Sequence, residues 1–428
     1  MKKINVCVFP AQNECAVEIN NALSICEGIE VFGLTSIRGH NEYNFKNYKY
    51  DIDDIDSELF IDEFNCFCKE KKIDIVFPTC DFAVEFFAKN KNKINALVTT
   101  PSFESAMICN DKRKTYSLFE KDGFCPKIYR KIEKYPCFIK PNDGEGSKGV
   151  KLIQSIGDIP NGIDLNKYII SEFLPGKEIT VDCLTDKNGK LVLCLPRIRE
   201  KIFSGMCVQG QTINSTIEIE KIASIINSKL SFRGLWFFQL KESFDGSLKL
   251  LEVSMRCAGT MCLTRARGFN LPLLTVYTIL GKEVDFINNS MEVKLDRTLF
   301  ARYNSSVSYN TVYVDYDGTI IIKEKVCLSV IRFLFQCKNA GKKIVLISRH
   351  NEDHNDSLYE NMKKYGISTF LFDEIYSISF EDEKYSYISD KNSIFIDNSF
   401  LERKKVFNNV SVPVFGVDGL DALQDWRL

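Results

Sequence analysis

The sequence predicts a multidomain protein that combines α/β and α+β folds. The chain has 428 residues, which at about 100–200 residues per domain allows two to four domains. Buried-type strands alternate with helical stretches near both ends of the chain, a pattern typical of parallel sheets. The middle is richer in strands and contains a glycine-rich segment. Boundaries drawn where these patterns change give domains at 1–105, 106–295 and 309–428, with a polar, serine-rich linker at 296–308.

Composition and charge exclude several classes of protein. Hydrophobic residues make up 45% and charged residues 26% of the chain, which excludes a disordered or fibrous protein. The formal net charge is −1, so the basic excess of nucleic-acid-binding proteins is missing and we expect no nucleic acid as a partner. No apolar run reaches the roughly 18 residues that suggest a membrane span. Gln12, Asn13 and Glu14 interrupt any signal-peptide core near the start.

The cysteines and histidines limit the chemistry and indicate a compartment. Sixteen cysteines are scattered without a C-x-x-C pair, which argues against a structural zinc site, and disulfide scaffolds are much shorter chains. We therefore expect reduced thiols and a cytoplasmic location. The only histidines are His40, His350 and His354, so we expect the chemistry to depend on carboxylates, lysines, arginines and backbone amides.

The first domain has the pattern of a parallel sheet covered by helices. Strands are predicted at 4–9, 29–35 and 73–81, and helices at 14–26 and 57–71. The first strand is followed by Pro10-Ala11-Gln12 rather than by a glycine-rich turn, so we expect no dinucleotide site at that end.

The middle domain contains the glycine-rich segment, which follows a predicted helix at 110–121 and a strand at 135–141. Gly144, Gly146 and Gly149 match G-x-G-x-x-G, but the β-branched residues at 150–155 predict a strand where a dinucleotide turn needs a helix. The segment is therefore predicted to be a flap between two strands. Its successive N–H groups would suit phosphate, and a plain hairpin turn is the alternative.

Two lysines and a second turn flank this flap. Lys112 lies upstream in NDKRKTY, Lys140 ends the strand before the flap, and SEFLPGKE follows at 171–178. In this order the motifs resemble the ATP-grasp family, in particular its branch similar to the carbamoyl phosphate synthase large subunit. The resemblance implies ATP and Mg²⁺ as cofactors, with lysines on the phosphate and adenine sides, backbone groups on adenine and a glutamate on the ribose. It assigns cofactor binding to Lys112, Lys140, Gly146, Ser147, Glu172, Phe173, Leu174 and Glu178.

A predicted hairpin supplies candidate metal ligands. The segment GLWFFQLKESFDGSLKLLEVSMR has Asp245-Gly246 at its turn, and a symmetric loop there places Gln239 opposite Glu252. Opposed side chains have Cβ atoms about 4.5–5.5 Å apart. Their oxygens can therefore share one Mg²⁺ ion, which prefers oxygen ligands. A solvated polar pair across the strands is the alternative.

Three arginines also match the family, and one serine departs from its pattern. Its pattern Glu-x-Asn-x-Arg is Glu252-Val253-Ser254-Met255-Arg256 here, so the resemblance implies Arg256 as a catalytic residue and Ser254 as a weaker metal ligand than asparagine. It further implies that Arg197 and Arg199 bind substrate near an acylphosphate, with a surface position as the alternative for Arg199. The resemblance covers residues 1–295 and implies a Rossmann-like N-terminal domain followed by the ATP-grasp domain.

The third domain carries a different motif. VYVDYDGTI places Asp315 and Asp317 after a predicted strand, and D-x-D-G-T resembles the signature of the haloacid dehalogenase (HAD) superfamily. The resemblance implies an HAD-like α/β domain with a parallel sheet. It assigns the nucleophile to Asp315, the general acid–base to Asp317, phosphate binding to Ser348 and stabilisation of the phospho-enzyme to Lys384. It assigns magnesium binding to Asp315, Asp317 and Asp397.

Two details bear on the activity and access of this third domain. Asn398 follows Asp397 where a second aspartate is common, so a retained fold with weak or no hydrolysis is an alternative. Only 32 residues separate Asp315 from Ser348, which leaves no room for a large cap domain.

Together these observations predict a bifunctional enzyme. An ATP-dependent carboxylate–amine ligase, acting through an acylphosphate, would be joined to an HAD-type phosphatase for a phosphorylated substrate or ligation product. The alternative is a ligase whose HAD-like domain is a non-catalytic docking or regulatory module. The Gln239/Glu252 pair disfavours a non-enzymatic nucleotide-binding protein. The expected partners are small-molecule carboxylates and amines, as in surface polysaccharide or metabolite biosynthesis; no membrane partner is expected, and homo-oligomer formation is left open.

Overall fold

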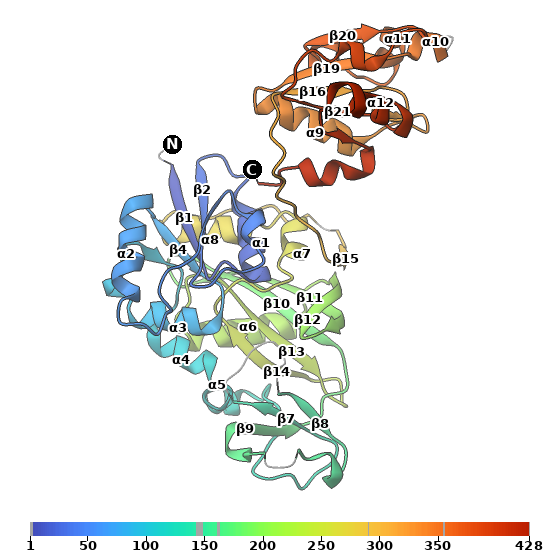
Figure 1. The fold of residues 1–428 in the computed structure, drawn as a ribbon. Helices are drawn as coiled ribbons and strands as arrows, with labels where there is room; N and C mark the ends of the chain where they lie inside the picture. The colour runs from blue at the N-terminus through green and yellow to red at the C-terminus, as the bar shows by residue number, and fades with distance from the viewer. Residues whose placement is uncertain (1–2, 143–148, 161–162, 290, 354–355, 428) are drawn as a thin grey trace. The chain divides into compact units, whose positions relative to one another are not determined.

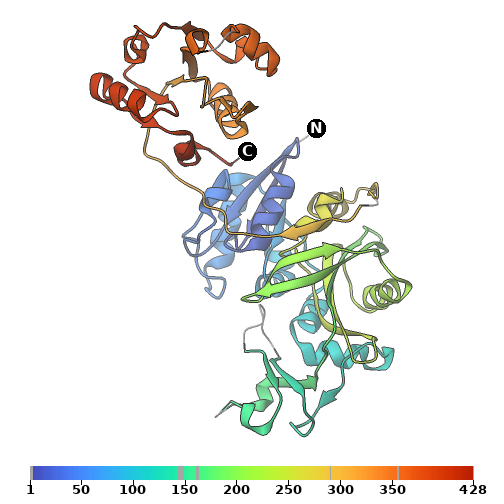
Figure 2. The same ribbon diagram turned by 90° about the vertical axis from the view of Figure 1, so that its right-hand side faces the viewer.

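The computed structural model describes residues 3–142, 149–160, 163–289, 291–353 and 356–427, whose helices and strands are drawn in Figures 1 and 2. The chain forms one compact unit up to residue 299 and a second over 300–427. The further division of the first unit at residue 105 stays a prediction. None of the described helices is both long enough and apolar enough to span a bilayer.

The first unit begins with a parallel five-stranded sheet. The central strand is buried on both faces: Val6 and Val8 pack against one layer of helix, whereas Cys7 and Phe9 pack against another. This explains why its sequence is continuously apolar rather than alternating. In spatial order the strands are β3 (Asn47–Lys49), β2 (Ile29–Leu34), β1 (Ile4–Phe9), β4 (Ile75–Pro78) and β5 (Leu97–Val98), and the helices are α1 (Glu14–Leu23), α2 (Phe60–Lys71) and α3 (Asp81–Lys89).

Two antiparallel sheets follow. A small sheet has the order β6 (Ile128–Tyr129), β9 (Tyr168–Glu172), β7 (Cys137–Pro141) and β8 (Lys151–Ile153). A larger one has the order β14 (Leu248–Ser254), β13 (Gly234–Glu242), β10 (Glu178–Thr185), β11 (Leu191–Phe203), β12 (Met206–Thr212) and β15 (Lys294–Asp296). The accompanying helices are α4 (Phe103–Asn110), α5 (Lys112–Phe119), α6 (Ile217–Lys229), α7 (Cys262–Ala266) and α8 (Leu271–Ile279).

The two faces of the larger sheet pack against different hydrophobic cores. Because side chains alternate along a strand, Trp236 and Phe238 of β13 face the core that contains α6, and Leu235 and Phe237 face the core that contains α1 and β1. Gln239 continues the second of these faces. The face that carries Leu235 and Phe237 in the core therefore carries a polar side chain farther along the same strand.

The structure modifies two sequence predictions in the first unit. The helix predicted at 110–121 is broken at Asp111, whose extended backbone ends α4 and whose carboxylate caps α5 by accepting from the Lys114 N–H at 3.0 Å. Lys112 thereby becomes the first residue of α5. Asp296, the first residue of the predicted linker at 296–308, pairs with Gln209 at the edge of the larger sheet, and the linker itself stays a prediction.

The second unit has the parallel sheet that the sequence predicts. Its strand order is β20 (Glu374–Ser377), β19 (Lys343–Ser348), β16 (Thr311–Val314), β21 (Ser393–Ile396) and β22 (Val414–Phe415). The order reverses at β16, so ligands are expected beyond the carboxyl ends of β16 and its neighbours. The helices are α9 (Leu328–Asn339), α10 (His350–Asp353), α11 (Leu358–Lys364) and α12 (Phe400–Val410), and a small hairpin joins β17 (Ile321–Ile322) to β18 (Lys325–Val326). This hairpin and α9 account for the residues between Asp315 and β19.

Candidate functional site

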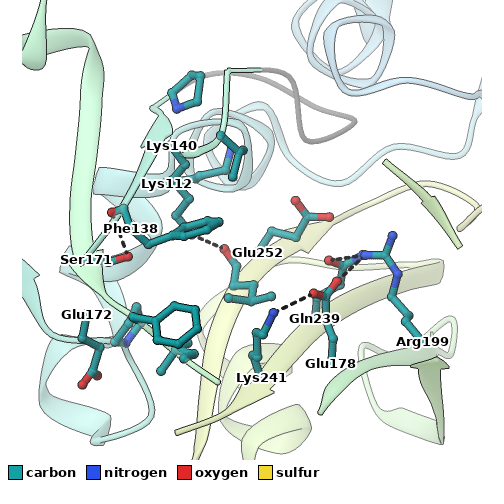
Figure 3. A pocket seen from close by; sticks show the side chains of 16 residues that line it. Lys112, Phe138, Lys140, Ser171, Glu172, Glu178, Arg199, Gln239, Lys241 and Glu252 are labelled. Carbon is teal, nitrogen blue, oxygen red and sulfur yellow. Dashed lines mark hydrogen bonds and ion pairs between the residues drawn. The ribbon is translucent and has the colours of Figure 1, made fainter. Parts of the chain in front are cut away.

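A pocket in the first unit lies between the two antiparallel sheets (Figure 3). Side chains from β7 and β9 line one side, side chains from β10, β11, β13 and β14 line the other, and Lys112 enters from α5. The pocket brings together residues that lie far apart in sequence and that the motifs had selected: Lys112, Lys140, Glu172, Phe173, Leu174, Glu178, Arg199, Gln239 and Glu252. Gly146 and Ser147, the predicted flap residues, lie outside the described residues.

The predicted opposition of Gln239 and Glu252 is confirmed, although the hairpin is not symmetric. From the turn, Glu242 pairs with Leu248 and Leu240 with Leu250, which would bring Gln239 opposite Leu251. A β-bulge inserts Leu251 as an extra residue and restores the pairing of Gln239 with Glu252. Both side chains line the pocket and present oxygen atoms to it.

The same bulge anchors Lys140. Its Nζ atom donates to the Leu251 carbonyl at 3.3 Å and to the hydroxyl of Tyr116, which itself donates to that carbonyl at 2.8 Å. Lys140 is only 7% exposed. Burial, together with the ammonium of Lys112, lowers the pKa of Lys140 to about 7. Lys140 is therefore only partly protonated near neutral pH, and negative charge that enters the pocket would favour its protonated form.

A chain of charged groups crosses the pocket wall beside Gln239. The Glu178 carboxylate accepts from Arg199 and, at 3.4 Å, from Lys241. Arg199 also donates to the Gln239 side-chain oxygen at 3.2 Å and to the Gly205 carbonyl at 3.1 Å. These hydrogen bonds fix the Arg199 side chain in the pocket wall, so Arg199 is not a solvated surface arginine.

The opposite end of the pocket is more apolar. Phe138 and Leu174 line it, and the ring of Phe173 meets that of Phe244 with centroids 6.2 Å apart. The Glu172 carboxylate is turned to the backbone, accepting from the Lys127 N–H at 2.8 Å. The pocket thus has an apolar part as well as a part that carries cations and oxygen ligands.

Three predicted residues lie elsewhere. Arg197 is 1% exposed, pairs with Asp182 and donates to Thr260 at 2.9 Å, so it is part of the buried sheet face rather than of this pocket. Arg197 and Arg199 point to the same face of β11, but Arg197 is two residues nearer the core.

Ser254 and Arg256 follow Glu252 but turn to Asp81 at the start of α3. Ser254 donates to Asp81 Oδ1 at 2.7 Å, and Arg256 Nε donates to the same atom at 2.9 Å. Asp81 takes the hydroxyl proton of Ser254 but leaves the oxygen lone pairs free, so the metal-ligand role of Ser254 stays a prediction. Neither side chain lines the described pocket.

The second unit assembles a separate group of polar residues at the carboxyl ends of its strands. Lys384 Nζ donates to Asp315 at 2.6 Å and to Asp397 at 2.7 Å, and all three are nearly fully buried. Burial and the Asp397 charge raise the pKa of Asp315 to about 7, while Lys384 opposes the shift. Although burial opposes it, the two carboxylates raise the pKa of Lys384. Thr319 donates to Asp315 at 3.0 Å.

Asp317 and Ser348 lie beside this group and meet a residue that the motifs did not reveal. His350 Nδ1 lies 2.9 Å from Asp317 Oδ1, and Ser348 Oγ donates to Asp317 at 3.4 Å. The only sequence signal for His350 was its place two residues after the end of a buried strand. Asn398 donates its backbone N–H to Thr319 at 3.0 Å, so it too belongs to this group.

Metal ligands in both units would come in small sets. The described part of the chain contains no cluster of three or more His, Cys, Asp or Glu side chains suited to a metal ion. The pairs Gln239/Glu252 and Asp315/Asp397 suit Mg²⁺. This ion commonly takes one or two carboxylates from the protein and completes its shell with water and substrate phosphates, whereas an ion held by protein atoms alone needs more ligands.

Comparisons with known proteins concern the first unit. Residues 164–298 match the family model described as "ATP-grasp in the biosynthetic pathway with Ter operon". A D-alanine–D-alanine ligase of Thermotoga petrophila is 31% identical over 109 residues, or 23% of this chain and 36% of the relative. A carbamoyl-phosphate synthase of Methanobrevibacter smithii is 25% identical over 210 residues, or 42% of this chain and 55% of the relative. The chain therefore matches only about a third to a half of the length of these relatives.

A similar solved structure supports the fold. It is the biotin carboxylase domain dimer of the Hydrogenobacter thermophilus 2-oxoglutarate carboxylase, in complex with MgADP, ADP and bicarbonate. The likeness has a TM-score of 0.55 at 14% sequence identity and covers 69% of this chain and 74% of that chain.

The buried pair beneath the pocket yields a stability prediction. We expect Asp182→Ala to lower the free energy of unfolding of the first unit by about 3–5 kcal/mol, because Arg197 would keep a buried charge without its partner. Urea titration followed by hydrogen-exchange mass spectrometry of β10 and β11 measures the loss. The double variant Asp182→Leu/Arg197→Met is the control and should recover most of it. An Asp182→Ala protein as stable as the wild type would show that Arg197 is not held in this way.

Proposed function

We propose, on the premise that residues 164–298 belong to the ATP-grasp family, that the protein is an ATP-dependent carboxylate–amine ligase. The observation that carries the proposal is the pocket in which Gln239 and Glu252 oppose each other within reach of Lys112 and Lys140. An apolar end suited to a base and a cationic end suited to phosphates are what a bound nucleotide requires. The relatedness to a D-alanine–D-alanine ligase supports amide bond formation as the reaction class.

In this proposal each part of the pocket has a role in holding ATP and Mg²⁺. Phe138, Phe173 and Leu174 enclose the adenine, with backbone groups at 172–174 as its hydrogen-bond partners, and Glu178 binds the ribose. Of Lys112 and Lys140, one contacts the phosphates of ATP and the other contacts the adenine side. Gln239 and Glu252 would hold Mg²⁺, which when bound supplies positive charge against the phosphate oxygens. Arg199 would contact the transferring phosphoryl group or the acylphosphate, because it already touches Gln239.

The reaction follows from the need for a leaving group better than hydroxide. A substrate carboxylate oxygen attacks the γ-phosphorus of ATP, the bond to the bridging oxygen breaks, and ADP leaves. The amine then attacks the acyl carbon, phosphate leaves with the electron pair of the C–O bond, and the nitrogen releases a proton to solvent. The protein contributes positioning and electrostatic stabilisation.

The first prediction from this proposal tests the proposed metal ligand. We expect Glu252→Ala to lower the rate of ADP release that depends on both carboxylate and amine by about 100-fold or more, because the transferring phosphoryl loses charge stabilisation. A coupled ADP assay over a panel of carboxylates and amines gives the measurement. Glu218→Ala, an exposed acidic residue on α6, is the matched control. Near wild-type turnover in Glu252→Ala would contradict the assignment.

A second prediction concerns the pH dependence of nucleotide affinity. In the free protein Lys140 has a pKa of about 7, and triphosphate favours its charged form. Affinity for ATP should therefore be highest below that pKa and fall as the pH rises above it, by up to about tenfold per pH unit until the pKa in the complex is reached. Calorimetric titrations at several pH values measure this slope. The Lys140→Met variant should bind ATP more weakly and lose this pH dependence of its affinity. An unchanged slope of affinity against pH in the variant would reject the role of Lys140 in phosphate binding.

A phosphatase activity of the second unit is a second candidate function. The observation that favours it is the buried Asp315–Lys384–Asp397 group at the carboxyl ends of parallel strands. Asp315 would attack the phosphorus of a phosphate monoester while Asp317 protonates the leaving oxygen. Water would then cleave the aspartyl-phosphate and restore the carboxylate. Asp315 and Asp397 would hold Mg²⁺, Ser348 would bind phosphate, and a non-catalytic docking or regulatory module is the rival role for this unit.

A third prediction separates the two activities. We expect Asp315→Asn to reduce hydrolysis of an aryl phosphate by about 1,000-fold or more, because the nucleophile is lost, while substrate-dependent ADP formation continues. Asp421→Asn, the same chemical change at an exposed residue of the second unit, is the matched control. If the wild-type protein hydrolyses no phosphate monoester that we test, including the ligation product, the docking-module role replaces the phosphatase.

A further inference from the structure

A second cavity opens in the first unit along the N-terminal half of β11. Its lining comes from residues 191–196 of that strand, from 213–215, from α6 and from the segment 267–288. It shares no lining residue with the nucleotide pocket described above. Its volume is about 480 Å³, within the roughly 300–1,000 Å³ of pockets that hold small molecules.

The cavity contains a buried cation without a counter-charge. Arg267 is 6% exposed, and its Nε atom has no hydrogen-bond partner. Its Nη2 atom donates to the Asn288 side-chain oxygen at 3.1 Å, and its guanidinium lies over the ring of Phe269. No carboxylate within the described ranges forms an ion pair with it. A buried charge that lacks a partner is costly, so an anion that enters the cavity would relieve that cost.

The remaining lining adds apolar walls and polar groups at the opening. Phe269 and Phe286 pack with ring centroids 5.8 Å apart, and Leu193 and Leu195 of β11 belong to the same apolar cluster. Asn214 and Asn288 are exposed at the opening. Glu220 is the acidic residue of the described lining, and it too is exposed, on α6. The buried part therefore offers one positive charge beside an aromatic wall.

We propose that this cavity is a binding site for a small organic acid, whose carboxylate pairs with Arg267 and whose apolar body packs against Phe269 and Phe286. One carboxylate balances the charge of one guanidinium. A phosphate dianion would leave excess negative charge in the buried part and would not use the aromatic wall.

Cys194 provides a reporter of occupancy inside the cavity. It is a free, partly buried cysteine in the lining, and its thiol lies 3.9 Å from the hydroxyl of Ser215. A ligand in the cavity should shield this thiol from alkylation. Cys66, which is free and exposed on α2, is the internal control because it lies outside the cavity lining.

The test measures iodoacetamide alkylation of Cys194 in the full chain by peptide mass spectrometry, with phenylacetate as the probe. At ten times its dissociation constant, phenylacetate should slow the alkylation of Cys194 about tenfold and leave that of Cys66 unchanged. Phenylacetamide, its neutral analogue, and inorganic phosphate should give little protection. The dissociation constant comes from ligand-observed NMR on the same protein.

Variants separate recognition by Arg267 from simple cavity filling. Arg267→Gln should abolish phenylacetate binding in the NMR titration. Ser224→Trp, at an exposed position in the cavity lining on α6, should block binding even if Arg267→Gln fails to fold, whereas Ser228→Trp, one turn farther along the same helix, should not. Equal protection by phenylacetamide, protection by phosphate alone, absence of phenylacetate binding, or unchanged binding in Ser224→Trp would each overturn the proposal.

Discussion

The β-bulge at Leu251 is the constraint on which the geometry of the nucleotide pocket depends. The turn by itself would pair Gln239 with Leu251, and a shift of one residue moves a side chain to the opposite face of a sheet. The extra residue brings Glu252 to the face of Gln239 and leaves the Leu251 carbonyl as an acceptor for Tyr116 and Lys140. One local irregularity thus positions both oxygen ligands and one of the two lysines.

The electrostatics of the first unit follow from where each charge lies along one sheet face. Leu235 and Phe237 fill the core, Asp182 and Arg197 form a buried pair next to it, and Glu178, Arg199 and Gln239 reach the pocket. Near the core, Asp182 and Arg197 neutralise each other as an ion pair. In the pocket, burial leaves Lys140 only partly protonated near neutral pH. The difference in position along the strand explains why Arg197 and Arg199, two residues apart on β11, have different partners.

The sequence predicts the features that depend on strand alternation and on the order of motifs. It does not predict the features that depend on contacts between distant parts of the chain. Strand alternation and the motif order identified Lys112, Lys140, Glu178, Gln239 and Glu252 as neighbours, and the pairing of Gln239 with Glu252 was right although its symmetric turn was not. The bulge has no signature in LKLLEVS. Asp81 captures Ser254 and Arg256 from a distant part of the chain, and His350 reaches Asp317 only because β16 and β19 are adjacent in the parallel sheet.

The most direct test of the central claim is a crystal structure of the full chain with Mg²⁺ and a non-hydrolysable ATP analogue. We expect the base between β7 and the segment that follows β9, and Mg²⁺ about 2.0–2.1 Å from oxygens of Gln239 and Glu252. Lys140 should keep its contact with the Leu251 carbonyl while it faces the phosphates. A nucleotide bound elsewhere, or a metal that contacts neither Gln239 nor Glu252, would contradict the assignment of this pocket.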